Sequence, residues 1–276
     1  QTQRIFKNEP TKMPLYLDQP VKDRASWQQY KKRLDPNAPG RWPDDWDGYV
    51  AAMNEVDCPV ALGVGSFFGF LREWMGLEPL AYALYDDPAW VEDMMDTMLD
   101  LELVVVERAL SRIKSVDFAM FWEDMAYKVG PLISPAMFRR FMLPRYRKLT
   151  DLIRKFGVDL IMVDSDGDVR TLIPLWLEGG VNGFFPLEVA AGMDAVALRQ
   201  EYGKDIWLIG NIDKRELAKG PQEVRAEVLK KVPYLLQTGG YFPCVDHAVP
   251  PDVSFENFKL FTNTMREVAG LPTLAF

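Results

Sequence analysis

Cysteine and histidine are scarce in this sequence, and their scarcity argues against several classes of site. The 276 residues contain two cysteines, Cys58 and Cys244, far apart and in no CxxC spacing. Neither a disulfide framework nor a metal site made of cysteines alone is indicated. His247 is the only histidine and no GxSxG motif is present, which argues against a hydrolase triad. The glycines of VDSDGD and LEGGVNGF stand in no GxGxxG or P-loop context, so a nucleotide-phosphate site is not supported.

Long apolar runs and net positive charge are also missing. Apolar stretches such as Leu160–Val163 are strand-like and far shorter than the ~20 residues of a membrane span. The first residues, QTQRIFKNEP, lack the pattern of a secretory signal, so a reducing cytoplasm is the expected location. A net charge of −8 and a pI near 4.9 oppose binding to nucleic acid and to anionic membranes.

What the chain has in quantity is apolar and aromatic residues. A hydrophobic content of 48% supports a substantial core and a single large domain. Residues 1–48 carry scattered prolines and tryptophans around one helical stretch, Asp23 to Leu34, and are expected to form an arm or connector. Residues 49–276 are expected to form the main domain.

From Cys58 onward, strand-like apolar runs alternate with amphipathic helical segments, which is typical of parallel βα units. Helices are expected at roughly 87–113, 135–156, 169–178, 194–202, 221–237 and 254–268. The predicted strands are Pro59–Val64, Phe118–Trp122, Leu160–Val163, Gly180–Phe185, Ile206–Ile209 and Gly240–Val245. The predicted fold class is α/β, a TIM (β/α)8-type barrel.

Six units are two fewer than the eight that close such a barrel. The favoured explanation is that an N-terminal segment with further strands precedes residue 1. A strand hidden in MPLYL is the alternative.

Reactive groups of α/β barrels lie on the loops that follow the strands, and here those loops are strongly acidic. Crowded carboxylates must share protons, bind cations or meet a cationic ligand. Helix capping is the favoured role for Asp168, Asp194 and Asp213. The groups that follow the predicted strands are Glu123, Asp124, Asp164, Asp166, Asp168, Glu188, Asn211, Asp213, Asp246 and His247.

His247 is favoured as a functional residue because imidazole is both a common metal ligand and the acid–base group of neutral pH. Cys244 is expected to be a small buried side chain. Together with Glu123, Asp164 and Asp166, His247 could complete a site for Zn²⁺ or another divalent metal. Glu123, Asp164 and His247 are also the candidate catalytic residues.

The motifs in their order resemble the uroporphyrinogen decarboxylase superfamily, which includes cobalamin-dependent methyltransferases. The resemblance runs from about Met13 to the C-terminus. It is carried by MPLYLDQPVKDRASWQQYKKRLDP, FFGFLREWMG, FWEDMAYKVGPLISPAMFRRFMLPRY, VDSDGDVRTLIPLWLEGGVNGFFPLEVAAGMD, IGNIDKRELAKG and GGYFPCVDHAVPPDVSFENF.

The resemblance implies different chemistry in different branches. Where thiol-activating methyltransferases have a motif similar to HxCG, this chain reads Asp164-Ser165-Asp166-Gly167, and His247 stands where a later cysteine completes their zinc site. A thiolate-rich site is therefore not carried over. The arginine-bearing loop and the aspartate with which the decarboxylases hold a tetrapyrrole also find no convincing match.

The preferred hypothesis is a methyltransferase that exchanges a methyl group between a small molecule and a corrinoid carried by a partner protein. Phe67, Phe68, Trp122, Glu188 and Tyr241 are expected to line its substrate pocket. The alternatives are a decarboxylase or lyase that moves protons through His247 and an aspartate, and a non-catalytic barrel that binds a corrinoid or tetrapyrrole. The resemblance also implies a possible homodimer.

Overall fold

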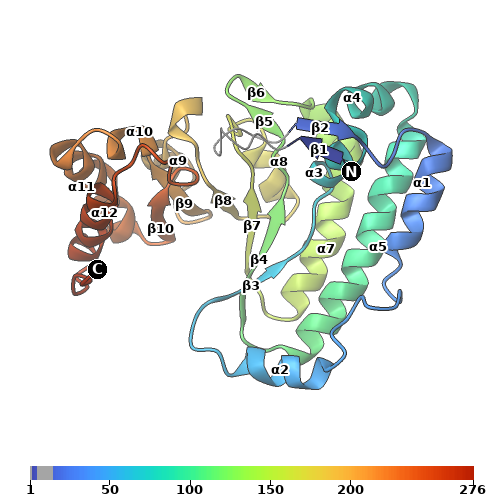
Figure 1. Ribbon diagram of the computed structural model, residues 1–276, viewed down its shortest axis with the longest axis horizontal. Coiled ribbons are helices and arrows are strands. Elements are labelled where there is room, and N and C mark those ends of the chain that lie inside the picture. The colour runs from blue at the N-terminus through green and yellow to red at the C-terminus, as the bar shows by residue number, and fades with distance from the viewer. Residues whose placement is uncertain (1, 5–14) are drawn as a thin grey trace. The chain divides into compact units, whose positions relative to one another are not determined.

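The computed structural model describes residues 2–4 and 15–276, which divide into two compact units. The first unit runs to Asp124 and includes Ile133–Val163 and Leu172–Val181. The second unit comprises Met125–Leu132, Asp164–Thr171 and Asn182–Phe276. Figure 1 labels the elements of both.

Three strands make up the sheet of the first unit, in the order β3 (Val60–Gly63), β4 (Val116–Trp122) and β7 (Leu160–Asp164). β3 and β4 are parallel, so a helical crossover must connect them. Ala119 and Phe121 alternate along β4 and are both fully buried. This alternation places one face of β4 in the core.

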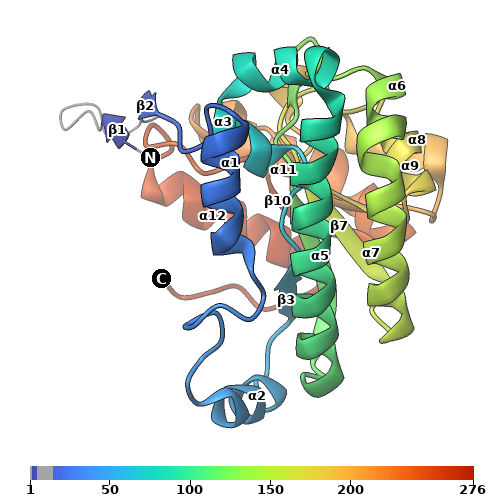
Figure 2. The same cartoon turned by 90° about the vertical axis from the view of Figure 1, so that its right-hand side faces the viewer.

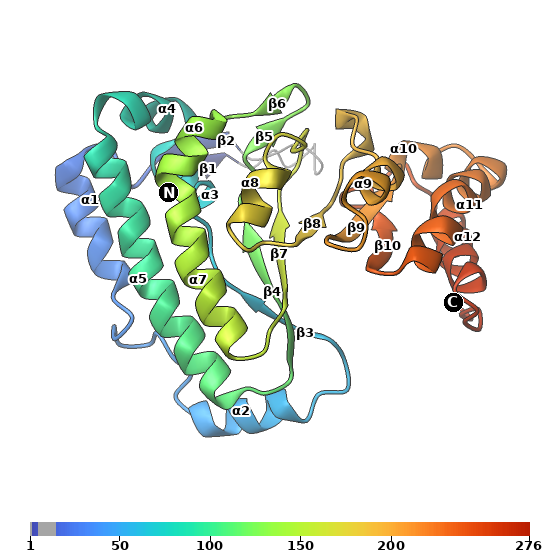
Figure 3. The same cartoon turned by 180° about the vertical axis from the view of Figure 1, so that it is seen from behind.

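Long helices cover the sheet of the first unit. α5 (Pro88–Arg112) and α7 (Leu143–Lys155) pack side by side (Figures 2 and 3). α5 buries Val91, Met94 and Met98 at the spacing of one helix face. The other elements of this unit are β1 (Thr2–Arg4), β2 (Leu15–Asp18), α1 (Arg24–Lys31), η1 (Lys32–Leu34), α2 (Trp46–Asn54), α3 (Gly69–Met75), α4 (Leu77–Asp86) and α8 (Ile173–Glu178).

The helix predicted at 135–156 forms in three pieces. α6 (Pro135–Met137) is followed by a π-helical turn, Phe138–Met142, and then by α7. Pro144, at the start of α7, has no N–H with which to continue the regular pattern of the preceding turn. The proline thus explains the interruption.

The second unit repeats the strand–helix arrangement. Its strands lie in the order β8 (Gly183–Phe185), β9 (Trp207–Ile212) and β10 (Tyr241–Val245), and each adjacent pair is parallel. The remaining elements are β5 (Ala126–Tyr127), β6 (Gly130–Pro131), η3 (Val189–Ala191), α9 (Ala195–Tyr202), α10 (Lys214–Leu217), α11 (Pro221–Thr238) and α12 (Phe255–Val268). Polar residues that follow these strands therefore share one edge of the sheet.

The structure contains all six predicted strands, which confirms the α/β class. Leu15–Leu17 of the MPLYL segment belong to β2, which pairs antiparallel with β1; Met13 and Pro14 lie outside the described residues. Among the helices of the described chain, none combines the length and apolar character that crossing a membrane requires.

Glu102, on the buried face of α5, makes the stability of the first unit depend on pH. Burial raises the pKa of its carboxyl from 4.5 to about 7, and nearby Arg41 opposes the rise. Between pH 4.5 and about 7 the unfolded chain has lost a proton that the folded chain keeps. The free energy of unfolding therefore falls by up to about 1.4 kcal/mol for each unit that the pH rises.

Glu102→Gln is therefore expected to raise the midpoint of thermal unfolding near pH 8 and to leave it close to wild type near pH 4, below both pKa values. Thermal unfolding followed across this range checks the difference between the two proteins. An equal difference at both pH values would contradict the assigned burial.

Candidate acid–base site

The second unit brings an imidazole and a carboxylate together at the ends of two strands. His247 follows β10 and Asp166 follows β7, and His247 Nε2 lies 3.2 Å from Asp166 Oδ2. The side chains are 47% and 34% exposed, respectively, so a small molecule can reach both. A carboxylate beside an imidazole orients the ring, and an accessible, oriented imidazole is suited to acid–base catalysis.

The loop that carries Asp166 is held on both sides. Ser165 donates its backbone N–H to Phe185 O at 2.9 Å, and its hydroxyl accepts the Met125 N–H at 3.0 Å. Gly167 has a φ of +84°, and a Cβ at this position would come within 2.6 Å of the backbone of the β5–β6 hairpin. Only glycine fits there, and the position of Asp166 is fixed accordingly.

Asp246 anchors the end of β10 immediately before His247. It is fully buried, and its two carboxylate oxygens accept the backbone N–H groups of Val189 at 2.9 Å and Lys214 at 3.0 Å. Burial raises the pKa of Asp246, and the two hydrogen bonds oppose the rise. The bonds tie β10 to the segments that follow β8 and β9.

An ammonium group also reaches this edge of the sheet. Lys214 Nζ lies 3.1 Å from Glu188 Oε1, with both side chains about four-fifths buried. Lys214 was not predicted as a site residue. Its signal in the sequence is its place directly after Asp213, at the end of a predicted strand.

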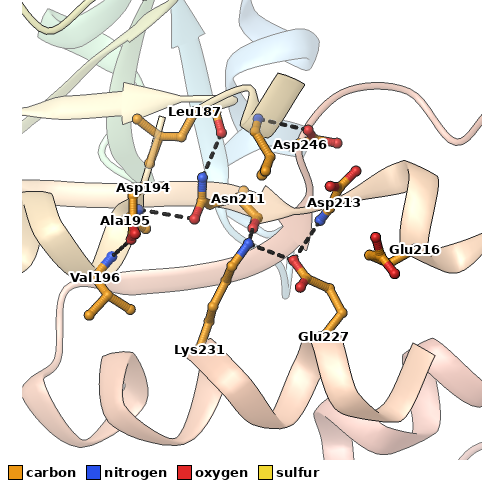
Figure 4. A network of polar contacts seen from close by, with 12 residues as sticks. Leu187, Asp194, Ala195, Val196, Asn211, Asp213, Glu216, Glu227, Lys231 and Asp246 are labelled. Atoms are coloured by element: carbon orange, nitrogen blue, oxygen red, sulfur yellow. Dashed lines mark hydrogen bonds and ion pairs between the residues drawn. The ribbon is translucent and has the colours of Figure 1, made fainter. Parts of the chain in front are cut away.

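A buried polar network supports the end of β9 (Figure 4). Asn211, with a φ of 65°, accepts the Ala195 N–H at 3.0 Å and donates to Leu187 O at 2.8 Å and Met193 O at 2.9 Å. Its own carbonyl accepts a hydrogen bond from Lys231 Nζ at 2.5 Å. Three chain segments are thereby joined at one amide side chain.

The ion pair beneath this amide lies on α11. Lys231 Nζ is 2.5 Å from Glu227 Oε1, and the same oxygen accepts the Asp213 N–H at 2.9 Å. Both side chains are 7% exposed. Because removing one member of such a pair leaves an uncompensated buried charge, we interpret it as structural support.

Asn211→Ala is expected to lower the free energy of unfolding by about 2–4 kcal/mol, since one buried N–H and two carbonyls lose their partners. Urea denaturation measures the loss. Asn263→Ala, which removes an amide on the exposed part of α12, is the matched control and is expected to cost less than about 1 kcal/mol. Equal losses in the two variants would show that the buried network adds little to the free energy of unfolding.

Glu123 has a different environment, in the first unit. It follows β4 and is fully buried. Burial raises its pKa, whereas the surrounding donors lower it. Its two carboxylate oxygens accept five hydrogen bonds of 2.6–3.2 Å, from the backbone N–H groups of Phe67, Phe68 and Gly69 and from the hydroxyls of Ser66 and Tyr146.

The structure thus places the predicted catalytic residues in two environments. Asp164, Asp166 and His247 belong to the second unit, where Asp166 and His247 are in contact. Glu123 belongs to the first unit, and its oxygens are occupied. Its predicted roles in catalysis and metal binding stay predictions, but the five donors describe a structural carboxylate.

The residues predicted to line a substrate pocket are mostly buried. Phe67 and Phe68 are 1% exposed, and Tyr241 is 6% exposed with its hydroxyl donating to Gly210 O at 3.0 Å. Trp122 and Glu188 are partly exposed. Their role in substrate binding stays a prediction.

The two cysteines and the predicted helix caps are also placed. Both thiols are free, and burial raises the pKa of Cys244 to about 12, which disfavours the thiolate. Asp194 and Asp213 cap α9 and α10 as predicted. The prediction for Asp168 is wrong: its carboxylate binds Arg170, and α8 begins only at Ile173.

A zinc site needs at least three protein ligands. Within residues 2–4 and 15–276, no group of three or more His, Cys, Asp or Glu side chains is arranged to hold a metal ion. Asp166 and His247, which are in contact, supply two of the three ligands that such a site needs. Zinc or another divalent ion stays a prediction.

Comparison with known proteins adds to this description. A family model described as "Uroporphyrinogen decarboxylase (URO-D)" matches residues 11–268. A uroporphyrinogen decarboxylase from Xanthomonas axonopodis pv. citri is 28% identical over 237 residues, which is 80% of this chain and 60% of that protein. One from Ruthia magnifica is 24% identical over 198 residues, 67% of this chain and 51% of that protein. The chain thus spans only about half to three-fifths of these relatives.

A solved structure, a methyltransferase from Methanosarcina mazei, has the same fold. Its TM-score is 0.64 at 15% identity, and the match covers 94% of this chain and 73% of that chain. This likeness confirms the predicted fold class.

Proposed function

Because the chain belongs to the uroporphyrinogen decarboxylase family, we propose that it is an enzyme in which His247 and Asp166 transfer a proton at the reacting atoms of a small substrate. The observation that carries the proposal is their 3.2 Å contact within the second unit, where Asp166 follows β7 and His247 follows β10. Asp166 orients the imidazole, and His247 gives or takes the proton.

Charge at these strand ends favours a neutral or cationic substrate. Three cations there are each paired with a carboxylate: Arg170 with Asp168, Lys214 with Glu188 and Arg215 with Asp213. Asp164 and Asp166 add further acid groups. A porphyrinogen with many carboxylates would be repelled by this surface, whereas an ether or a methylated amine would not.

We therefore propose methyl transfer from a methoxylated small molecule as the reaction. The bond between oxygen and the methyl carbon breaks, and the leaving oxygen takes the proton of His247 as charge develops on it. A corrinoid held by a partner protein would supply the methyl acceptor. The methyltransferase from Methanosarcina mazei with the same fold supports this choice.

Decarboxylation is the second candidate, and the names of the curated relatives favour it. In that reaction the imidazole would protonate the carbon from which carbon dioxide leaves. The substrate would have to place its carboxylates among the acidic residues described above.

One assay separates the two reactions. The protein is incubated with methoxylated aromatics and reduced cobalamin, and methylcobalamin is followed by its absorbance. In parallel, uroporphyrinogen is supplied and its carboxyl groups are counted by chromatography. Methylcobalamin formed without loss of carboxyl groups supports the proposal, and loss of carboxyl groups alone would overturn it in favour of decarboxylation.

Three further features belong to the proposal. The proposed partner is the corrinoid protein, and the proposed assembly is a homodimer. The proposed location is the cytoplasm, which would keep the thiols of Cys58 and Cys244 reduced. The metal content of wild type and of His247→Ala, measured by mass spectrometry, tests the metal prediction.

A further inference from the structure

A pocket of about 310 Å³ lies within the first unit, between the segment α1–η1, α3 and α5. It takes no part in the proton transfer proposed above. Its wall combines aromatic rings with two polar groups that lack hydrogen-bond partners in the part of the chain that the structure describes. This combination indicates a ligand site.

The aromatic wall consists of Tyr30, Phe70 and Trp74. The ring centroids of Tyr30 and Trp74 are 5.0 Å apart, and those of Phe70 and Trp74 are 6.0 Å apart. Clustered rings of this kind attract alkylated ammonium groups through their negative faces. The wall therefore favours a cationic, methylated end of a ligand.

Glu102 supplies a carboxyl group to the same pocket. Its side chain is 9% exposed, and within the described parts of the chain it has no hydrogen-bond partner. A carboxylate buried without a partner is costly, and a cation bound beside it would remove that cost. Glu102 and the aromatic rings therefore both favour a cationic group of a ligand.

Arg41 supplies the complementary charge. Its buried Nε atom has no hydrogen-bond partner within residues 2–4 and 15–276, while another nitrogen of the guanidinium donates to Arg33 O. A guanidinium N–H left in this state pairs best with a carboxylate. The charge of Arg41 already lowers the pKa of Glu102, but neither the carboxyl group nor the Arg41 Nε atom has a hydrogen-bond partner among the described residues.

We propose that this pocket binds a small zwitterion, with its methylated ammonium group against the rings and Glu102 and its carboxylate at Arg41. The proposal is independent of the reaction proposed for the second unit. A volume of about 310 Å³ suits a molecule of the size of an N-methylated amino acid.

Binding of such a ligand is expected to depend on pH. The ligand favours the ionised form of Glu102, whose pKa burial raises to about 7, so affinity rises as pH increases through 7. The other charged or titratable groups that line the pocket are Arg41, Glu73 and Tyr30, and the Arg33 guanidinium lies 5.8 Å from the centroid of the Tyr30 ring. The expected pH dependence is therefore assigned to Glu102.

Titration calorimetry tests the proposal with three probes. Glycine betaine carries both charges, choline lacks the carboxylate, and 3,3-dimethylbutanoate lacks the cation. Betaine is expected to bind at least about tenfold more tightly than either of the others. Equal binding of all three, or no binding of betaine at millimolar concentration, would overturn the proposal.

Variants then locate the site. Glu102→Gln and Arg41→Gln are each expected to weaken betaine binding by at least about tenfold, because each removes one of the two charge contacts. Glu107→Gln, on the exposed face of the same helix, is the matched control and is expected to bind as wild type does. Wild-type affinity for betaine in both Glu102→Gln and Arg41→Gln would show that the ligand binds elsewhere and would contradict the proposal.

Discussion

Replacing Glu123 with alanine is expected to lower the free energy of unfolding by about 3–5 kcal/mol, among the largest losses for a single change in this chain. The carboxylate is fully buried and accepts five hydrogen bonds. Without it, three backbone N–H groups and two hydroxyls lose their acceptor in a closed space. Urea denaturation of the two proteins, followed by circular dichroism, measures the difference.

Two further variants distinguish the contribution of the Glu123 carboxylate to stability from that of one of its donors. Glu123→Gln keeps the shape but puts an NH2 group against backbone donors, so a loss of about 1–3 kcal/mol is expected. Tyr146→Phe removes one donor, and about 1 kcal/mol is expected. If Glu123→Ala were within about 1 kcal/mol of wild type, the structural role of this residue would be contradicted.

The largest loss of activity is expected from His247→Gln. Removing a positioned acid–base group lowers kcat by about 10²–10⁴-fold. Glutamine cannot exchange a proton at neutral pH, although it fills a similar volume and can still donate a hydrogen bond to Asp166. The measurement is kcat with the methoxylated donor identified by the assay above.

The KM and the stability of His247→Gln show whether the loss of kcat arises from weaker substrate binding or from unfolding. KM and the urea midpoint are expected to stay close to those of wild type, because His247 is about half exposed. Asp168→Asn alters the same loop but removes only a partly exposed ion pair with Arg170, and its kcat is expected to fall by less than about threefold. A matching loss in both variants would point to disruption of the loop instead of proton transfer.

Most of the sheet could be predicted from the sequence because buried parallel strands read as short apolar runs. FAMFW, LIMV and GGYFPCV each fall on a strand of the structure. The short helices α2, α3, α4 and α10 were not predicted. Each has 10 residues or fewer, which leaves little length for an apolar period, although α1, α8 and α9, which have 8 residues or fewer, were predicted.

The site was predictable in part. The rule that reactive groups follow the strands selected His247 and Asp166, which are in contact. It also selected Glu123, whose five donors depend on the β3–α3 loop and on Tyr146 of α7. Such long-range contacts leave no local pattern in the sequence, and neither does the pocket around Glu102.

The most direct test of the proposed proton transfer is the kcat of Asp166→Asn, His247→Gln and the double variant, measured with the same donor. Residues that act as one unit show non-additive losses. If Asp166 acts through His247, the double variant is expected to lose no more than about threefold beyond His247→Gln alone. Losses that multiply, or a His247→Gln variant with wild-type kcat, would contradict an acid–base pair at this site.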